Sequence, residues 1–379
     1  MSEVGSYVSE KINVSKLRLE NYISTENMIS NRGGISLATK LPSVKTTTAF
    51  QKGDILISNI RPYFKKIWLA DKSGGCSNDV LVIRSDSNFS NRFLYYVLSS
   101  DTFFDYAVST SKGTKMPRGD KSSIMKYTVP LFSLEEQELI SDILKSYDEK
   151  IQLNKQINHH LEQIGQELFE QVYYNGSPAQ LGDIISTLES GSRPKGGAEI
   201  GGIPSIGAEN IERFGQYDYT KEKFISLEYF KKLNRGVVHS GDVLLYKDGA
   251  YTGKVSMALD NFPHAQCAIN EHVFILRPSK RAPSSFFLYF LLLYDENRQA
   301  LFSRASSKAA QPGLNQTEVK TLSILLPTTE EIIKFDNTIA PIMHQIAKNA
   351  NENRKLSTLR DTLLPKLLSG EIPVNQAAK

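Results

Sequence analysis

The sequence predicts an α+β protein in which one plan occurs twice: two similar α/β domains, each followed by a long helix. Two observations predict this plan. Three short motifs return in the same order in the two halves of the chain, and two stretches of about 40 residues share one helical spacing of apolar residues. A repeat period near half of the 379 residues indicates two copies of one domain-plus-helix unit rather than a solenoid.

The repeated motifs align the two halves of the chain. They lie about 177, 188 and 195 residues apart, and such a drift is what small insertions produce. The matched segments are Val4–Ser9 with Leu181–Ser186, Gly53–Ile57 with Gly241–Leu245, and Val129–Phe132 with Ile324–Pro327.

These matches divide the chain into four segments. We expect a first globular domain at 1–130, a long helix within 131–177, a second globular domain at 178–326 and a second long helix within 327–379. Short apolar runs predict strands at Asp54–Ser58, Asp79–Ile83, Val243–Tyr246 and His272–Leu276. Shorter helices are predicted at Asn91–Ser99 and Ser284–Tyr294.

The two long segments carry a 4-3 spacing of apolar residues, which predicts helices of about 40 residues and roughly 60 Å. The first seam runs from Ile140 to Val172 and the second from Phe335 to Leu363. A narrow apolar seam on so long a helix needs a partner. We therefore expect the two helices to pack as an antiparallel coiled coil with a pseudo-two-fold axis.

Two asparagines interrupt the middle of each seam, 195 residues apart between the copies. They are Asn154, Asn158, Asn349 and Asn353. In an antiparallel pair the two middles meet, so the four amides are expected to hydrogen-bond and to fix the register of the helices. The alternative is that they face solvent in a loosely packed stretch.

Charge is distributed unevenly, although the net charge is only +4. Residues 1–130 carry +7 and residues 131–177 carry −6, while 178–326 and 327–379 carry +2 and +1. Basic globular segments favour phosphate backbones, and acidic segments avoid them. By itself this balance is a weak indication of a nucleic-acid partner.

The sequence shows no sign of a membrane segment or an oxidising compartment. No signal-like start is evident, and no apolar run approaches the roughly 18 residues of a membrane span. Cys76 and Cys267 fall in corresponding stretches of the two copies, so we expect reduced, buried thiols rather than a disulfide or a metal pair. We therefore expect a cytoplasmic protein without a metal site.

An enzyme needs a constellation of reactive residues, and none is evident. The sequence lacks a phosphate-cradling loop ending in Lys-Ser or Lys-Thr, and it lacks the Asn-Pro-Pro-Tyr and Asp-Pro-Pro-Tyr motifs of amino-methyltransferases. Gly191–Gly197 fits a loop better than a phosphate site, and the adjacent His159 and His160 diverge on a helix face. We expect no catalytic residues and no cofactor.

In the order of its motifs the chain resembles the specificity (S) subunit of type I restriction–modification systems, over essentially its whole length. The resemblance rests on Gly-Asp-Ile-Leu-Ile-Ser-Asn-Ile-Arg-Pro-Tyr at 53–63, Ser-Gly-Ser-Arg-Pro-Lys-Gly at 190–196, the helix entries at Glu135-Glu136 and Glu330-Glu331, and the run from Thr362 to Ile372. Each motif alone is moderately specific, but their doubled order is highly specific. Ile332 departs from the Gln that the family usually has there.

The resemblance implies two target-recognition domains, each of which reads one half of a bipartite site in double-stranded DNA. It implies that the antiparallel helices act as a spacer and dock methyltransferase (modification) subunits, two in number. Methyl transfer and cleavage would belong to these partners and to the restriction/translocase subunits of the full complex. If the helices are a ruler, an insertion after Gln166, beyond the asparagines, is expected to lengthen the unread gap.

Candidate DNA contacts follow from position and side-chain chemistry. Asn and Arg make bidentate contacts with bases in the major groove, whereas Lys mostly neutralises phosphates. The candidates in the first domain are Ser58, Asn59, Arg61, Tyr63, Lys65, Lys66, Lys112, Lys115 and Arg118. Those in the second domain are Arg193, Lys195, Lys247, Tyr251, Lys254, Lys308, Gln311 and Asn315. For any single one, a solvated surface side chain is the alternative.

Two other functions compete with this interpretation. One is a fused restriction or methyltransferase enzyme whose catalytic part lies outside this chain. The other is a structural adaptor that never contacts DNA. The lack of motor, nuclease and methyltransferase motifs argues against the first, and the matched basic domains argue against the second.

Overall fold

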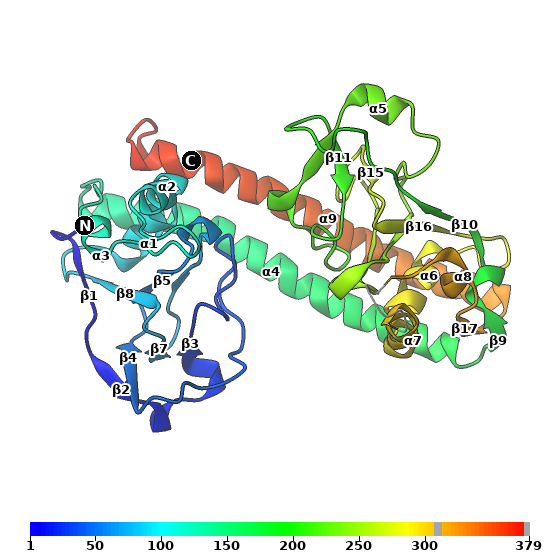
Figure 1. The fold of residues 1–379 in the computed structure, drawn as a ribbon, viewed down its shortest axis with the longest axis horizontal. Helices are drawn as coiled ribbons and strands as arrows, with labels where there is room; N and C mark the ends of the chain where they lie inside the picture. The colour runs from blue at the N-terminus through cyan, green and yellow to red at the C-terminus, as the bar shows by residue number, and fades with distance from the viewer. Residues whose placement is uncertain (307–312, 375–379) are drawn as a thin grey trace. The chain divides into compact units, whose positions relative to one another are not determined.

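The computed structural model describes residues 1–306 and 313–374, which form two compact units (Figure 1). The first unit contains Met1–Glu149 and the chain from Ser357 onward, and the second contains Lys150–Leu356. Each unit therefore combines one globular domain with part of both long helices, and neither helix belongs to a single unit.

The first unit is built on a four-stranded antiparallel sheet with the order β1-β8-β5-β6. Its strands are β1 (Gly5–Tyr7), β5 (Ile55–Ser58), β6 (Ile67–Leu69) and β8 (Val80–Ser85). A smaller sheet, β2-β4-β7-β3, contains β2 (Lys11–Asn13), β3 (Tyr22–Ile23), β4 (Thr46–Phe50) and β7 (Gly74–Cys76). The helices are α1 (Asn91–Ser99), α2 (Asp101–Ser109) and α3 (Lys121–Ile124), with 3₁₀ turns η1 (Val14–Lys16), η2 (Leu19–Asn21) and η3 (Pro62–Phe64).

The second unit contains a main sheet with the order β10-β16-β13-β14. Its strands are β10 (Ile185–Ser190), β13 (Val243–Tyr246), β14 (Val255–Met257) and β16 (Val273–Pro278). A three-stranded sheet holds β11 (Ile203–Ile206), β12 (Lys223–Ile225) and β15 (Ala268–Ile269), and β9 (Ser177–Gln180) pairs with β17 (Ser323–Leu326). The helices are α5 (Leu227–Lys231), α6 (Ser285–Leu293), α7 (Asp295–Ser306) and α8 (Gln316–Lys320), with 3₁₀ turns η4 (Leu181–Asp183), η5 (Tyr219–Lys221) and η6 (Gly249–Tyr251).

The two main sheets share one strand order: β1 corresponds to β10, β8 to β16, β5 to β13 and β6 to β14. A parallel strand pair, β3–β7 or β11–β15, lies in the smaller sheet of each unit. The helix that follows the main sheet begins at a capping serine in both units, because Ser90 and Ser284 accept backbone N–H groups of α1 and α6. The prediction of two copies of one α/β domain is confirmed.

The match of Val4–Ser9 with Leu181–Ser186 is wrong by three residues. The N–H of Asp86 donates to the carbonyl of Val4 at 3.0 Å, and the N–H of Ser279 donates to that of Ile184 at 2.7 Å. Val4 therefore corresponds to Ile184. The glycine that follows an apolar residue in both segments misleads the alignment, because the first copy's glycine lies in β1 and the second copy's lies in η4.

The two long helices are α4 (Leu134–Tyr173) and α9 (Thr329–Leu368), each of 40 residues. α9 continues through Pro341 and Pro365 without a break. In the second unit Lys150 of α4 lies opposite Glu352 of α9, with Nζ 3.6 Å from Oε2. Further along α4, Asn158 contacts Asn349 and Phe169 contacts Phe335, so the two helices are antiparallel in this unit (Figure 1).

Each long helix begins with a capping box. The N–H of Ser133 donates to Oε2 of Glu136 at 2.9 Å, and the N–H of Thr328 donates to Oε2 of Glu331 at 2.9 Å. These hydrogen bonds lower the pKa of both glutamates. The second residue of each repeated Glu-Glu pair therefore marks a helix start.

The other end of the helix pair belongs to the first unit. Nη1 of Arg360 lies 2.6 Å from Oδ1 of Asp148. The core of this unit includes Ile140 of α4 and Leu367 of α9, both fully buried. The helices are therefore antiparallel here as well, and the expected antiparallel pairing is confirmed within each unit.

Candidate nucleic-acid interface

The candidate residues of the first domain gather where β5 ends. Ser58 is the last residue of β5, and its hydroxyl donates to the carbonyl two residues further on at 3.1 Å. Arg61 and Lys65 flank η3 with left-handed backbones, at φ 51° and 50°. Between them Tyr63 is 46% exposed, and its ring contacts the ring of Phe64, with centroids 4.8 Å apart. The turn thus presents aromatic rings to solvent beside cationic side chains.

The glycine-containing loop after α2 packs on this turn. The N–H of Gly119 donates to the carbonyl of Asn59 at 3.0 Å, and the N–H of Arg61 donates to the carbonyl of Pro117 at 2.8 Å. A Cβ on Gly119 would come within 2.8 Å of the Asn59 side-chain oxygen, so the glycine leaves room for this side chain beneath the loop. Two groups of candidates that are some 50 positions apart in sequence therefore form one surface.

The cations of this loop differ in their surroundings. Lys112 and Arg118 exchange two backbone hydrogen bonds of 2.9 Å, which close the loop. Lys112 also forms an ion pair with Asp120, and Nη2 of Arg118 lies 3.2 Å from Oδ1 of Asp79. Lys115 is exposed near the tip. The loop therefore carries one solvated cation between two that are bound to carboxylates.

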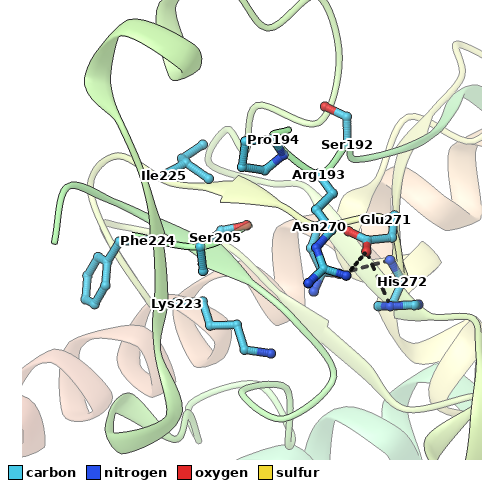
Figure 2. A pocket seen from close by; sticks show the side chains of 11 residues that line it. Ser192, Arg193, Pro194, Ser205, Lys223, Phe224, Ile225, Asn270, Glu271 and His272 are labelled. Carbon is cyan, nitrogen blue, oxygen red and sulfur yellow. Dashed lines mark hydrogen bonds and ion pairs between the residues drawn. The ribbon is translucent and has the colours of Figure 1, made fainter. Parts of the chain in front are cut away.

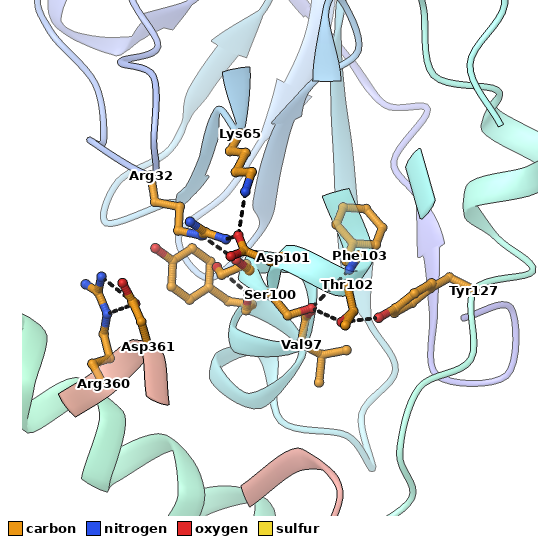
Figure 3. A network of polar contacts seen from close by, with 12 residues as sticks. Arg32, Lys65, Val97, Ser100, Asp101, Thr102, Phe103, Tyr127, Arg360 and Asp361 are labelled. Atoms are coloured by element: carbon orange, nitrogen blue, oxygen red, sulfur yellow. Dashed lines mark hydrogen bonds and ion pairs between the residues drawn. The ribbon is translucent and has the colours of Figure 1, made fainter. Parts of the chain in front are cut away.

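Lys65 and Lys66 are held by neighbours within the domain. Nζ of Lys65 lies 2.6 Å from Oδ1 of Asp101, and Arg32 forms an ion pair with the same carboxylate (Figure 3). Nζ of Lys66 donates to the carbonyl of Thr25 at 2.6 Å, and partial burial lowers the pKa of this lysine. Both lysines thus contribute to the internal structure of the turn.

The second domain repeats the turn after β13 with glycines. Gly249 and Gly253 lie 188 positions after Arg61 and Lys65, and they have the same left-handed sense, at φ 70° and 92°. The 3₁₀ turn η6 begins at Gly249, as η3 begins directly after Arg61. The two copies therefore share one backbone shape but place different side chains on it.

Tyr251 occupies in the second domain the position that Tyr63 occupies in the first, 188 residues earlier. Tyr251 is 55% exposed. Nζ of Lys254 lies 4.6 Å from the centre of this ring and 3.0 Å from Oε1 of Glu212. An exposed tyrosine beside a cation is thus common to both turns.

Lys247 directly follows β13 and is less accessible than the sequence suggests. Its N–H donates to the carbonyl of His272 at 3.0 Å, and its own carbonyl accepts from Leu314 at 2.8 Å. Its Nζ lies 3.4 Å from Oδ2 of Asp248 and 5.2 Å from the Phe274 ring centre. The late loop thus returns to the turn in the second domain, as it does in the first.

The structure describes only one of the three candidates in this late loop. Lys308 and Gln311 lie outside the described residues. Asn315 caps α8: its side-chain oxygen accepts from the N–H of Glu318 at 2.8 Å, and Oε2 of Glu318 accepts from the Asn315 N–H at 2.8 Å. This capping box occupies the oxygen of Asn315 and leaves its amide NH₂ for other contacts.

The glycine-rich stretch Gly191–Gly197 is a loop that leads into β11 rather than into a helix. A Cβ on Gly191 would lie 1.9 Å from the carbonyl oxygen of Ile269, so this glycine permits a close backbone approach. Nη1 of Arg193 lies 3.7 Å from Oε1 of Glu271, at a hollow of about 90 Å³ (Figure 2). Lys195 is exposed on the same loop.

Sequence reasoning missed part of this surface. Phe64 and Met116 of the first domain are 38% and 49% exposed beside the candidates, and Phe302 of the second is 46% exposed. Phe302 and Arg298 line a groove of about 400 Å³ that also contains Tyr251. A residue-by-residue comparison at the 188-residue offset would have matched Arg61 with Gly249 and Tyr63 with Tyr251, but nothing in the sequence places α7 beside η6.

The asparagines of the helix seam form two hydrogen-bonded pairs inside the second unit. Nδ2 of Asn154 donates to Oδ1 of Asn353 at 2.9 Å, and Nδ2 of Asn349 donates to Oδ1 of Asn158 at 2.8 Å. All four side chains are buried. The alternative of solvent-facing amides is therefore wrong.

The described part of the chain contains no group of three or more His, Cys, Asp and Glu side chains that could hold a metal ion. None of its helices is both long and apolar enough to cross a membrane. Cys76 and Cys267 are buried, unpaired thiols, and burial raises the pKa of each to about 12.

Comparison with known proteins gives this arrangement a family. The profile of the type I restriction modification DNA specificity domain matches the chain twice, over residues 9–163 and 178–360. The chain is 22% identical over 378 residues to the specificity subunit of the type I restriction enzyme MjaIX of Methanocaldococcus jannaschii, covering 94% of this chain and 86% of that protein. It is 23% identical over 460 residues to the HindI specificity subunit of Haemophilus influenzae, covering 98% of each.

A solved structure has the same fold. The S subunit of a type I restriction–modification system from M. genitalium matches with a TM-score of 0.58 at 16% identity, over 97% of this chain and 94% of that one. At this identity the likeness concerns the fold alone, and the two profile matches carry the assignment. The chain belongs to the family of type I restriction–modification DNA specificity subunits, with one specificity domain matched in each half.

Proposed function

We propose that this chain is the DNA-reading subunit of a type I restriction–modification complex and that each globular domain reads one half of a bipartite site. One observation carries the proposal: the same turn, after β5 and after β13, presents an exposed tyrosine and nearby cations in both domains. A late loop packs on that turn in each case. Two equivalent surfaces on one chain are suited to two separate segments of one duplex.

The candidate residues divide by chemistry into two groups. Lysines on these surfaces, such as Lys115 and Lys195, neutralise phosphates and set the affinity, while amide and guanidinium groups are suited to base edges. Tyr63 and Tyr251 offer a flat apolar ring with a hydroxyl, which packs against sugar or base and hydrogen-bonds at its tip. Lys308 and Gln311, which lie outside the described residues, remain part of the proposal on the sequence alone.

The two long helices connect the two readers in this proposal. They set the number of unread base pairs between the half-sites, and they dock two methyltransferase subunits. The restriction/translocase subunits join in the full complex. The specificity chain supplies no catalytic residue of its own, and methyl transfer takes place on its partners.

The two competing functions are less well supported. A fused enzyme would need a catalytic part, and the chain aligns over nearly all of its length with proteins named as specificity subunits. An adaptor that never contacts DNA would not need two matched turns with exposed tyrosines and cations. The profile that matches both halves is that of a DNA specificity domain.

Deletion of the gene for this chain in its host tests the proposal. Methylome sequencing is expected to find a bipartite adenine-methylation motif that disappears on deletion and returns with a plasmid copy. The purified chain, incubated with labelled S-adenosylmethionine and DNA, is expected to transfer no methyl group. A motif that survives the deletion, or turnover that follows this polypeptide through stringent purification, would contradict the proposal.

A further inference from the structure

Among the described residues, three that are neither glycine, asparagine nor aspartate have left-handed backbones, and all three surround one turn of the first domain. They are Arg32 (φ 61°), Arg61 (φ 51°) and Lys65 (φ 50°). A side chain with a Cβ is strained in this conformation because the Cβ crowds the following carbonyl. Strain of this kind persists where the surroundings or a function require the side chain.

Two of the three residues are explained by their surroundings. Arg32 and Lys65 both bind the carboxylate of Asp101 (Figure 3). The N–H of Arg32 also donates to the carbonyl of Lys65 at 2.9 Å. The ion pairs and the backbone bond offset the strain, so these two side chains stabilise the corner between η3 and α2.

Arg61 has no such explanation inside the domain. Its side chain makes no ion pair and no hydrogen bond with any described residue, and its Nε is buried without a partner. Its hydrogen bonds to described residues are made by the backbone alone: the N–H donates to the carbonyl of Pro117 at 2.8 Å, and the carbonyl accepts from the N–H of Phe64 at 2.9 Å. The second copy shows that the turn does not need an arginine, because Gly249 holds the same position at φ 70°. The fold would be satisfied by glycine at residue 61.

The neighbouring cations are engaged where Arg61 is not. Lys112 and Arg118 bind carboxylates, and Nζ of Lys66 donates to a backbone carbonyl. Lys115 is exposed, but a lysine mainly neutralises phosphate. Arg61 is therefore the one candidate of the first domain that combines a planar donor fork, no partner among the described residues and a backbone that glycine would suit better.

We infer that Arg61 is a specificity-determining residue and that it reads a guanine in the half-site of the first domain, through paired N–H bonds to O6 and N7. This inference rests on the proposed function. The two parallel N–H groups of a guanidinium match the two acceptors that guanine presents in the major groove. No other base edge offers them an equally good match. Gly249 offers no equivalent contact, so the second domain reads its half-site with other side chains.

The test compares the wild-type chain with Arg61→Gly, each assembled with its methyltransferase subunits. Glycine is the residue that the second copy uses, so the variant is expected to fold, and its unfolding midpoint is measured first. Dissociation constants are then measured for duplexes in which each G·C pair of the first half-site is replaced in turn. Matched replacements in the second half-site serve as the control.

The wild-type complex is expected to discriminate against replacement of one particular guanine by roughly 5- to 150-fold. Arg61→Gly is expected to lose that discrimination while keeping discrimination at every other position. Uniformly weaker binding to all duplexes, with a salt slope lower by about one, would identify a phosphate contact and overturn the inference. Unchanged binding, or a first half-site without guanine, would also overturn it. A wild-type complex without any bipartite preference would overturn the proposed function itself.

Discussion

Asp54 holds Arg84 through both carboxylate oxygens, with Nε 2.7 Å from Oδ1 and Nη2 2.8 Å from Oδ2. Asp242 holds Arg277 in the second domain at the same two distances. Asp54 is 1% exposed and Asp242 is 2% exposed. The repeated Gly-Asp motif therefore joins the start of β5 or β13 to the neighbouring strand β8 or β16. It is a structural ion pair at the opposite end of these strands from the proposed DNA surface.

Replacing Asp54 by alanine is expected to destabilise the first unit by about 3 kcal/mol. The buried carboxylate is the bidentate partner of Arg84, and removing one member of a buried pair leaves the other charge uncompensated. Glu10→Ala is the matched control, because Glu10 binds the same arginine at 3.1 Å but is 66% exposed in its side chain. The control is expected to cost under about 1 kcal/mol. The free energies of unfolding are measured with urea, and equal losses for the two variants would contradict this account of the motif.

Gly249→Ala is expected to destabilise the second unit by about 1 to 2 kcal/mol. An added Cβ meets no atom closer than 4.0 Å there, so backbone strain at φ 70° is the only cost. Gly201→Ala is the control, because Gly201 also has open space but no positive φ. That control is expected to be neutral or slightly stabilising. Thermal unfolding midpoints are measured for the wild-type chain and for the two variants. Equal midpoints would show that the turn is not held in the left-handed region.

Asn349→Ala is expected to cost about 1 to 3 kcal/mol, because it leaves the buried side-chain oxygen of Asn158 without its donor. Asn337→Ala, at an exposed position of the same helix, is the control and is expected to cost under about 0.5 kcal/mol. The double variant with Asn158→Ala is expected to cost less than the sum of the two single variants, by at least about 0.5 kcal/mol. Strict additivity would mean that the two amides do not stabilise each other, contrary to the hydrogen bond between them.

The sequence predicts those features that a pattern sustained over many consecutive residues produces. It does not predict features that depend on contacts between residues distant in sequence. The long helices were predictable because their apolar spacing is sustained over many turns. The small strands β2 and β4 were not, since threonine-rich runs such as Thr46–Phe50 carry no clear apolar alternation. The Asp101 carboxylate that binds Arg32 and Lys65 lies too far away in sequence to be inferred. The candidate turns were found, but not their left-handed backbones.

The structure shows that the insertion that tests whether the helices set the spacing belongs at a different position from Gln166. Gln166 lies beside Gly165, where a Cβ would come within 2.4 Å of the Phe290 ring, and near the fully buried Phe169. An insertion after Gln166 would therefore disrupt the second core. Paired insertions of four residues after Glu149 in α4 and after Leu356 in α9 leave the pairings within each unit intact.

Four helical residues add about 6 Å, close to two base pairs at about 3.4 Å each. We expect the paired insertion to leave both half-sites unchanged and to widen the unread gap by about one or two base pairs. Methylome sequencing of a strain that carries the variant measures the gap. An unchanged gap in a complex that still methylates its site would show that the helices do not set the spacing.

The central claim is that each domain reads its own half-site, and an exchange of the first domain tests it most directly. Residues 1–130 are replaced by the first domain of another family member, with the α9 contacts at Leu364 and Leu367 retained because they complete the core of the first unit. Methylome sequencing of the strain is expected to show a motif in which only one half has changed. A motif in which both halves change, or in which neither does, would contradict the account.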